Sequence, residues 1–420
     1  MGGVNAVRRL WGHRDFRWLW LSQSLSSVGD RMIIIVVALF VVEQTGSARD
    51  LGIVLAAQTA PFVVLLLLGG VWADRLPRQR IMVGSDVVRF AIQALTAGLI
   101  FAGDVPIWLL ATLGAGFGAA EAFFRPAYTG LIPQTVPEDL IQEAQALTQT
   151  SNNVARFVGP ALATAIALGA GFGWAYLIDA ATFLVSALLL LLVRARVRDP
   201  AAAAPRSSLR AELAGGYREV RTRAWVWVTL LGGLVLVFAS VAPFFALGAV
   251  VARDQYGSSV VFGWLDVAAG VGTIVGALVG IRWRPLRPVA SAWMMLGLWP
   301  VVIAMFALGL PLGIVLPGMG LAGFAVTLFM VWWETALAER IPPSALSRVS
   351  SYDWMVSSSL LPVGYLLSGV LAERLDAATV LAVGCAIGFV AAPLALASRQ
   401  LRAVRRSGAD ADPASGKVPA

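Results

Sequence analysis

Charged side chains stand inside long apolar runs of this sequence, where they are the residues best suited to bind or move ions. Asp30 and Arg31 lie near the middle of the first such run, residues 16–42. Where a run crosses a membrane, an ionised side chain at its centre costs at least about 2.5–3.5 kcal/mol, so it requires a partner or a function. Adjacent side chains point about 100° apart on a helix and cannot both be paired within it. We expect Asp30 to bind a proton or cation and Arg31 to pair with a neighbouring helix; a purely structural pair between helices is the alternative.

Three more charges lie in the fourth and fifth apolar runs. Glu121 and Arg125 have the i, i+4 spacing of a salt bridge along one helix face, which lowers the cost of burial. A structural role is the leading interpretation for this pair. Arg156 lies about halfway along the fifth run. It could meet Glu121 or Asp30, or bind an anionic substrate group directly.

A buried carboxyl group can take up and release a proton. Movement toward or away from an Arg changes how readily a buried carboxyl group holds its proton. The depth of Asp30 in its run makes this residue our hypothesis for that group.

The second half of the chain offers gate and cavity candidates. Glu334 and Asp353 lie near the expected cytoplasmic ends of their runs, which favours a role in a gate. Asp179 and Asp266 lie a few residues inside the outer ends of theirs, and Asp266 is the stronger functional candidate of the two. Aromatic side chains could contact a bulky ligand, although such residues more often pack helix against helix. The candidate cavity lining is Phe123, Phe124, Asp266, Trp299, Trp332, Trp333 and Trp354.

Composition excludes a water-soluble protein. Of 420 residues, 58% are hydrophobic and 13% are charged, against about 25% charged in ordinary soluble domains. Twelve membrane helices of about 20 residues would take up about 240 residues, which agrees with that hydrophobic fraction. A single His and a single Cys, His13 and Cys385, exclude a disulfide framework and argue against a metal site. No nucleophile–base pair or phosphate-binding Gly loop stands out, so we expect neither an enzyme nor a cofactor.

The chain is predicted to be an all-α integral membrane protein with twelve transmembrane helices. The first run carries Asp30 and Arg31 in its middle and lacks a convincing cleavage site, so it is not a signal peptide. Weak internal matches at an offset near 207 residues predict two pseudo-symmetric halves of six helices. The predicted spans are 16–42, 51–72, 81–102, 105–127, 142–168, 172–193, 224–251, 259–281, 289–309, 312–337, 346–371 and 376–397.

Arg residues concentrate in alternate loops. The loops on the opposite side hold only Arg49, Arg253 and Arg374, so the positive-inside rule predicts cytoplasmic termini. This pattern also explains the net charge of +8 without a nucleic-acid partner. The expected domains are a first half (1–193), a cytoplasmic linker with a short amphipathic helix (194–223), a second half (224–397) and a disordered tail (398–420).

The loop from Gly70 to Arg80 carries the most specific motif. Its sequence Gly-Val-Trp-Ala-Asp-Arg-Leu-Pro-Arg-Gln-Arg resembles the signature loop of the major facilitator superfamily, although Trp72 and Pro77 replace the usual Leu and Gly. A Gly allows close approach of two helices. The resemblance implies an inner gate in which Asp74 pairs with Arg residues, and we expect Asp86 and Arg89 to stabilise the gate together with this loop. The predicted gate residues are Gly70, Asp74, Arg75, Arg78, Arg80, Asp86 and Arg89.

Within that superfamily the chain resembles the branch of macrolide-efflux and enterobactin-export proteins. The similar stretches are 15–20 with 29–30, 124–127, 137–146 and 159–160. This resemblance implies proton-driven export of lipophilic compounds or siderophores. Two departures weaken it: Thr112 stands where proton-coupled drug exporters often have Arg, and Ala residues follow Gly159-Pro160 where they have Gly.

The sequence therefore predicts a secondary transporter working by alternating access, with efflux of a lipophilic or amphiphilic molecule as the leading function. An uptake symporter or uniporter for a nutrient is the nearest alternative, and a non-transporting receptor or scaffold is a more distant one. The expected partners are the lipid bilayer, a small-molecule substrate and protons, and a monomer in the bacterial inner membrane is expected.

Overall fold

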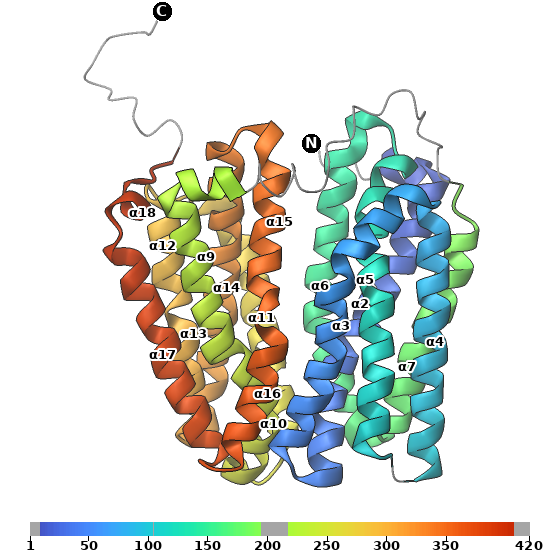
Figure 1. The fold of residues 1–420 in the computed structure, drawn as a ribbon, viewed down its shortest axis with the longest axis vertical. Coiled ribbons are helices and arrows are strands. Elements are labelled where there is room, and N and C mark those ends of the chain that lie inside the picture. Colours follow the sequence, from blue (N-terminus) through green and yellow to red (C-terminus); the bar gives the residue numbers. More distant parts are fainter. Residues whose placement is uncertain (1–8, 104, 195–216, 407–420) are drawn as a thin grey trace, which may run out of the picture. The chain divides into compact units, whose positions relative to one another are not determined.

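The computed structural model describes residues 9–103, 105–194 and 217–406, and within these ranges the chain is helical with no strand (Figure 1). The first half contains six helices of membrane length. They are α2 (Arg14–Thr45), α3 (Ala48–Arg75), α4 (Arg78–Ala102), α5 (Ile107–Thr135), α6 (Ile141–Gly169) and α7 (Phe172–Leu191).

The second half also contains six membrane-length segments, three of them broken into shorter helices. A π-helical turn, η3, joins α9 to α10, and short breaks separate α12 from α13 and α15 from α16. The elements are α9 (Ala224–Leu236), η3 (Val237–Val241), α10 (Ala242–Tyr256), α11 (Val260–Arg282), α12 (Pro288–Leu296), α13 (Leu298–Ala307), α14 (Leu312–Arg340), α15 (Pro343–Ser359), α16 (Leu361–Ala372), α17 (Ala377–Ala397) and the short α18 (Arg399–Ala403).

Eleven helical segments of the described chain are long and apolar enough to cross a membrane. The remaining membrane-length helix is α6, whose 29 residues are sufficient in length at 1.5 Å per residue. Its first half carries Gln, Thr, Ser and Asn side chains, which lower its hydropathy. The predicted twelve-helix fold is confirmed, with α6 as its most polar member.

Local signals set the helix ends. Gly46 has a φ of 68° and donates its backbone N–H to the carbonyl of Val42, which ends α2 in a left-handed turn. The Ser47 side chain then accepts a hydrogen bond from the backbone N–H of Asp50 and caps α3. A two-residue connection thus reverses the chain between the first two helices.

The chain divides into two compact units. The first comprises Met1–Pro205 with Phe245–Val267 and Leu361–Ala377, and the second comprises Arg206–Phe244, Ala268–Leu360 and Ala378–Ala420. The units therefore cut across the halves read from the sequence, because the α10–α11 corner and α16 group with the first six helices.

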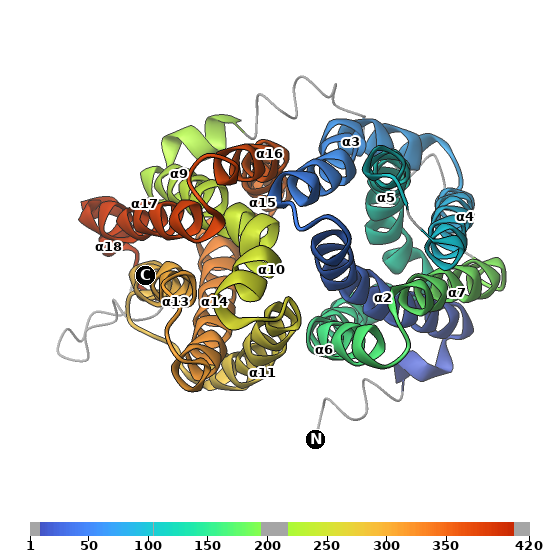
Figure 2. The same cartoon turned by 90° about the horizontal axis from the view of Figure 1, so that it is seen from below.

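Packing in the first unit brings α2 against α6 and α7, α4 against α7, and α3 against α5 (Figure 2). Close approach depends on small residues. A Cβ atom at Gly118 of α5 would overlap the backbone carbonyl of Gln58 in α3. Near the C-terminal end of α3, Gly69 lies against the backbone of Ala122, whereas a Cβ atom at Gly70 would meet nothing within 4 Å. Gly70 was expected to allow the close helix contact, and the structure assigns that part to Gly69.

The predicted amphipathic helix of the linker lies mostly outside the described residues. The described part, 217–222, is helical, and Val220 packs into the apolar core of the second unit. Part of the predicted disordered tail, 398–420, is helical: Arg399–Ala403 form the short helix α18, in which Leu401 is buried. The rest of the tail, from residue 407 onward, also lies outside the described residues.

Candidate functional site

Arg89 of α4 is the centre of a buried charge network in the first unit. Its side chain is 1% exposed, and its Nη2 atom lies 2.5 Å from Asp86 Oδ1 on the same helix. Its Nη1 atom lies 3.8 Å from Asp30 Oδ1 of α2, and the Asp30 side chain is 35% exposed. One guanidinium therefore joins a fully buried carboxyl group to a partly accessible one.

Aromatic rings enclose the Arg89 guanidinium. Its central carbon lies 4.2 Å from the ring centre of Phe124 and 4.3 Å from that of Phe183, with Phe117 at 5.9 Å. Cation–π contacts of this kind are strongest where water is excluded. Phe124 was predicted to line a substrate cavity; it is buried against Arg89 and takes part in the charge network.

Asp86 is held in place by a second helix. The Ser186 hydroxyl of α7 donates to Asp86 Oδ2 at 2.7 Å, and the amide of Gln23 in α2 lies 3.5 Å from Ser186 Oγ. Asp86 and Arg89 were predicted to stabilise the inner gate together with its loop. In the structure both side chains are buried and pair with each other, and Arg89 also contacts Asp30.

Asp179 of α7 adds another buried carboxyl group. Its side chain is inaccessible, and the Gln93 amide of α4 donates to Asp179 Oδ2 at 2.5 Å. Gln93 was absent from the predicted site because it is uncharged. The spacing of Asp86, Arg89, Gln93 and Thr96 places them on one face of α4, and that periodicity was a signal that could have found it.

The expected salt bridge between Glu121 and Arg125 of α5 is present. Arg125 Nη2 and Nε donate to Glu121 Oε1 at 2.6 and 2.8 Å. The Arg125 side chain is 52% exposed and that of Glu121 is 19% exposed. Phe62 of α3 lies beneath the Arg125 guanidinium, 5.6 Å from its central carbon to the ring centre.

Arg31 of α2 lies among charges from other helices of the first unit. It interacts electrostatically with Asp30, with Asp266 of α11 and with two like charges, Arg125 and Arg156. α6 lies very close to α2 here: a Cβ atom at Gly159 of α6 would overlap Arg31 Cβ and the adjoining backbone of α2. The structure thus brings Asp30, Asp266 and Arg156, from three helices, within electrostatic range of Arg31.

The predicted gate loop connects α3 to α4. Arg78 donates to the backbone carbonyls of Gly130 in α5 and, at 3.4 Å, Ala73 in α3. Arg75 and Arg80 are exposed. Asp74 lies in the last turn of α3, and its side chain is outside the described part of the molecule.

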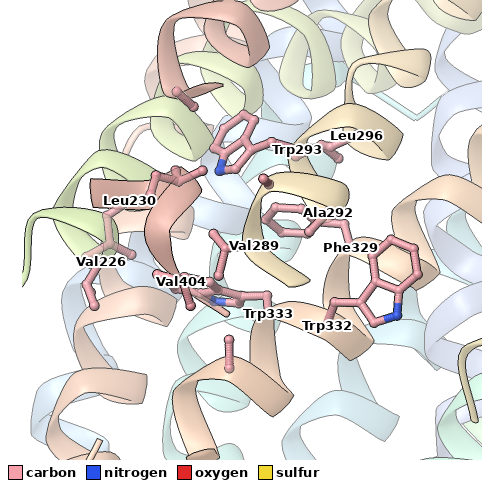
Figure 3. Packing of buried hydrophobic residues seen from close by; sticks show 14 of the residues in the cluster. Val226, Leu230, Val289, Ala292, Trp293, Leu296, Phe329, Trp332, Trp333 and Val404 are labelled. Carbon is pink, nitrogen blue, oxygen red and sulfur yellow. The ribbon is translucent and has the colours of Figure 1, made fainter. Parts of the chain in front are cut away.

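Two of the predicted cavity residues belong instead to the apolar core of the second unit. Trp332 and Trp333 of α14 are 3% and 2% exposed and pack with Trp293 and Phe329 (Figure 3). Trp332 Nε1 donates to the carbonyl of Trp283 at 3.0 Å. The cavity assignment of both residues was therefore wrong, because a helix that is apolar all round gives no sign of which face meets its neighbours.

The other second-half candidates are distributed over several environments. Trp333 Nε1 donates to Asp353 Oδ2 at 2.9 Å, and Glu334 is exposed. Trp354 is 66% exposed, and Trp299 packs edge-on against Phe244 with ring centres 5.5 Å apart. In the first unit Phe123 packs edge-on against Trp72 at 5.4 Å.

The family model of the Major Facilitator Superfamily matches residues 19–360 of this chain. The chain belongs to this superfamily. It is therefore a multi-pass membrane transporter, for which a lipid bilayer and a small-molecule substrate are implied. The resemblance seen in the gate loop extends across the fold.

Efflux proteins are among the relatives of this superfamily member. It is 24% identical over 376 residues to macrolide efflux protein A of Streptococcus pyogenes, covering 86% of this chain and 90% of that protein. It is 25% identical to the enterobactin exporter EntS of Escherichia coli, covering 94% of both, and 25% identical to the multidrug efflux pump Tap of Mycolicibacterium fortuitum, covering 83% of this chain and 87% of Tap.

Solved transporters share the fold of this superfamily member. A crystal structure of a variant of the nucleoside transporter NupG matches with a TM-score of 0.71 at 13% identity, covering 91% of this chain and 99% of NupG. An inward-facing, unoccupied bacterial homologue of the human lysosomal transporter Spinster matches with a TM-score of 0.68 at 17% identity, covering 94% and 99%.

Metal chemistry has no visible support in the part of the transporter that the structure describes. No group of three or more His, Cys, Asp or Glu side chains there could hold a metal ion. Asp86 pairs with Arg89 and Asp179 accepts a hydrogen bond from Gln93.

Proposed function

We propose that this superfamily member exports a lipophilic or amphiphilic small molecule in exchange for protons, with Asp30 as a proton-binding group. The observation that carries the proposal is the contact between Asp30 and Arg89. Asp30 is partly accessible near the middle of a membrane helix and lies 3.8 Å from a cation that is itself 1% exposed. A carboxyl group at that boundary can exchange a proton with water and can respond to movement of the buried Arg.

The export direction is supported by the relatives, three of which are named for efflux or export. Each of them matches over more than four-fifths of this chain. We propose further that the transporter is a monomer of the bacterial inner membrane with both termini in the cytoplasm, on the positive-inside distribution of its Arg residues. Rocking of two helical bundles around a central site would provide alternating access.

A vesicle experiment tests proton coupling. Purified protein would be reconstituted with a pH gradient and offered a macrolide antibiotic and, separately, a catecholate siderophore. We expect the gradient to drive accumulation in the wild type and to have no effect on Asp30→Asn, which cannot exchange a proton at that position. Unchanged gradient-driven transport by Asp30→Asn would eliminate the proposed role.

A matched carboxyl variant controls for general damage. Asp139→Asn removes an acid whose partner is Arg9, in an exposed pair on the surface of the protein. It should transport as the wild type does. Cells lacking the protein provide the test of direction: retained compound indicates export, and reduced uptake of the compound would favour a symporter or uniporter.

A further inference from the structure

One guanidinium faces three carboxyl groups in the first unit. Arg89 interacts electrostatically with Asp30, Asp86 and Asp179, all of them within membrane-spanning helices. Burying several ionised carboxylates around a single cation is strongly unfavourable, so the network cannot hold all three in the charged form without further partners. The question is which group carries the proton.

Two of the carboxyl groups have partners that suit the ionised form. Asp86 accepts from the Arg89 guanidinium at 2.5 Å and from the Ser186 hydroxyl at 2.7 Å. Asp30 lies 3.8 Å from Arg89 and interacts electrostatically with Arg31, and its side chain is 35% exposed. Charge-assisted contacts of this kind stabilise a carboxylate.

Asp179 is the exception. Its side chain is fully buried, and its donor is the uncharged amide of Gln93, while Oδ1 has no hydrogen-bond partner among the described residues. The helices packed against α7 contribute Asp30 from α2 and Arg89, with Asp86 beyond it, from α4. On α7 itself the nearest titratable group is Tyr176, and Arg156 of α6 acts on Arg31.

An amide is a partner that serves both protonation states of a carboxyl group. A neutral acid can donate its O–H to the amide oxygen while it accepts from the amide N–H, and an ionised acid accepts the N–H alone. Gln93 can therefore keep its contact with Asp179 while a proton arrives or leaves. A purely structural contact would not require a partner that can bind both the neutral and the ionised carboxyl group.

A small cavity borders Gln93, the hydrogen-bond partner of Asp179. It measures about 30 Å³, which exceeds the roughly 10–15 Å³ needed for one water molecule, and it lies among α2, α3, α4, α5 and α7. Gln93 and Tyr176 are on its wall, together with Gln58 and Thr96. The Tyr176 hydroxyl is buried and has no hydrogen-bond partner among the described residues. The cavity therefore reaches to within one hydrogen bond of Asp179.

We propose that Asp179 is a second, exchangeable proton-binding site, reached through this cavity by way of Gln93. Protonation breaks one O–H bond of a hydronium ion in the cavity, leaves a water molecule there and forms the O–H bond of Asp179; release of the proton reverses the step. The site lies wholly within the first unit. The inference rests on the proposed proton coupling and gives it a second carboxyl group besides Asp30.

Infrared difference spectroscopy on the full-length reconstituted protein tests the site without any substrate. The spectrum of the wild type minus that of Asp179→Asn should contain a carboxylic acid C=O band. The band should shift after transfer to deuterium oxide, because the proton exchanges with water. Absence of the band would show that Asp179 is ionised, and a band that does not shift would show a sealed structural proton; either result would overturn the proposal.

Two further variants keep the test decisive. Asp86→Asn replaces a carboxyl group of equal burial on the next helix, and its difference spectrum should lack such a band because Asp86 is ionised. Gln93→Leu leaves Asp179 in place and should move the band by removing the hydrogen bond, even if Asp179→Asn folds poorly. A carboxylic acid band that is unaffected by Gln93→Leu would contradict the proposal that Gln93 binds the protonated carboxyl group of Asp179. These spectra do not depend on transport, so failure of the Asp30 experiment and failure of this one are separate results.

Discussion

Gly29 of α2 lies against the carboxyl group of Asp179 in α7, so closely that a Cβ atom at position 29 would overlap Asp179 Oδ1 and Thr182 Oγ1. The next residue in α2, Asp30, reaches Arg89 of α4. The two residues therefore have different roles at neighbouring positions of α2. Gly29 leaves space for the buried carboxyl group of Asp179, and Asp30 supplies a second carboxyl group next to Arg89. This relationship explains why Gly stands beside a charge in the middle of an apolar run.

Gly29→Ala should destabilise the protein by overpacking this contact. Inserting a methyl group into a well-packed core costs about 1–3 kcal/mol, which exceeds or offsets the gain of up to about 1 kcal/mol from better helix propensity. Thermal unfolding in detergent measures the difference. Gly98→Ala on α4 is the matched control, since a Cβ atom there meets nothing within 4 Å. Equal melting temperatures for the two variants would contradict the packing argument.

Removing Arg89 should be among the most damaging single changes in the first unit. Arg89→Met leaves the buried Asp86 carboxylate without its cation, and breaking a buried pair in this way costs about 3–5 kcal/mol. The double variant Asp86→Asn with Arg89→Met should recover much of that loss, because no uncompensated charge remains. Unfolding measurements on both single variants and the double variant would show it. Simple addition of the two losses would argue against a direct ion pair.

The sequence predicted the helices well because their ends carry local signals. Apolar runs are bounded by residues such as Gly46 and Pro106, and the observed ends of α2 to α7 lie within a few residues of the prediction, except that α5 continues to Thr135. The i, i+4 pair of Glu121 and Arg125 was predictable for the same reason, because both partners lie on one helix.

Partners on different helices were not predictable in this way. The contacts of Arg89 with Asp30 and of Gln93 with Asp179 depend on which helices pack together and how each is rotated. Trp332 and Trp333 show the same difficulty, because a helix that is apolar on every side does not reveal which face is buried. The sequence thus indicates where the helices are, and the structure adds which side of each helix faces its neighbours.

Trp333→Ala should lower stability far more than Trp354→Ala. Trp333 is buried in the core of the second unit, and removing a buried Trp side chain costs about 3–5 kcal/mol. Trp354 is 66% exposed, and substitutions away from packed sites usually change stability by less than about 0.5 kcal/mol. Thermal unfolding of the two variants in the same detergent provides the comparison. A larger loss from Trp354→Ala would mean that the core is misassigned.

Two same-helix ion pairs of the first unit, Glu121 with Arg125 and Asp86 with Arg89, should differ in strength because they differ in burial. Glu121 and Arg125 resemble Asp86 and Arg89 in chemistry, but the Arg125 side chain is 52% exposed and that of Arg89 is 1% exposed. Solvent screens an exposed pair, whose contribution is about 0–1 kcal/mol, whereas the loss of one partner from a buried pair costs about 3–5 kcal/mol. We therefore expect Glu121→Gln to leave the melting temperature nearly unchanged.

A double-mutant cycle for each pair measures this contrast. The cycle of Glu121→Gln and Arg125→Gln should give a coupling energy no larger than about 1 kcal/mol, and raised salt should weaken it. The cycle of Asp86→Asn and Arg89→Met should give a larger coupling that responds little to salt, because the Phe124 and Phe183 rings exclude water from the guanidinium. If the two couplings were equal, burial would not be what distinguishes the pairs, and the case for a sealed network around Arg89 would fail.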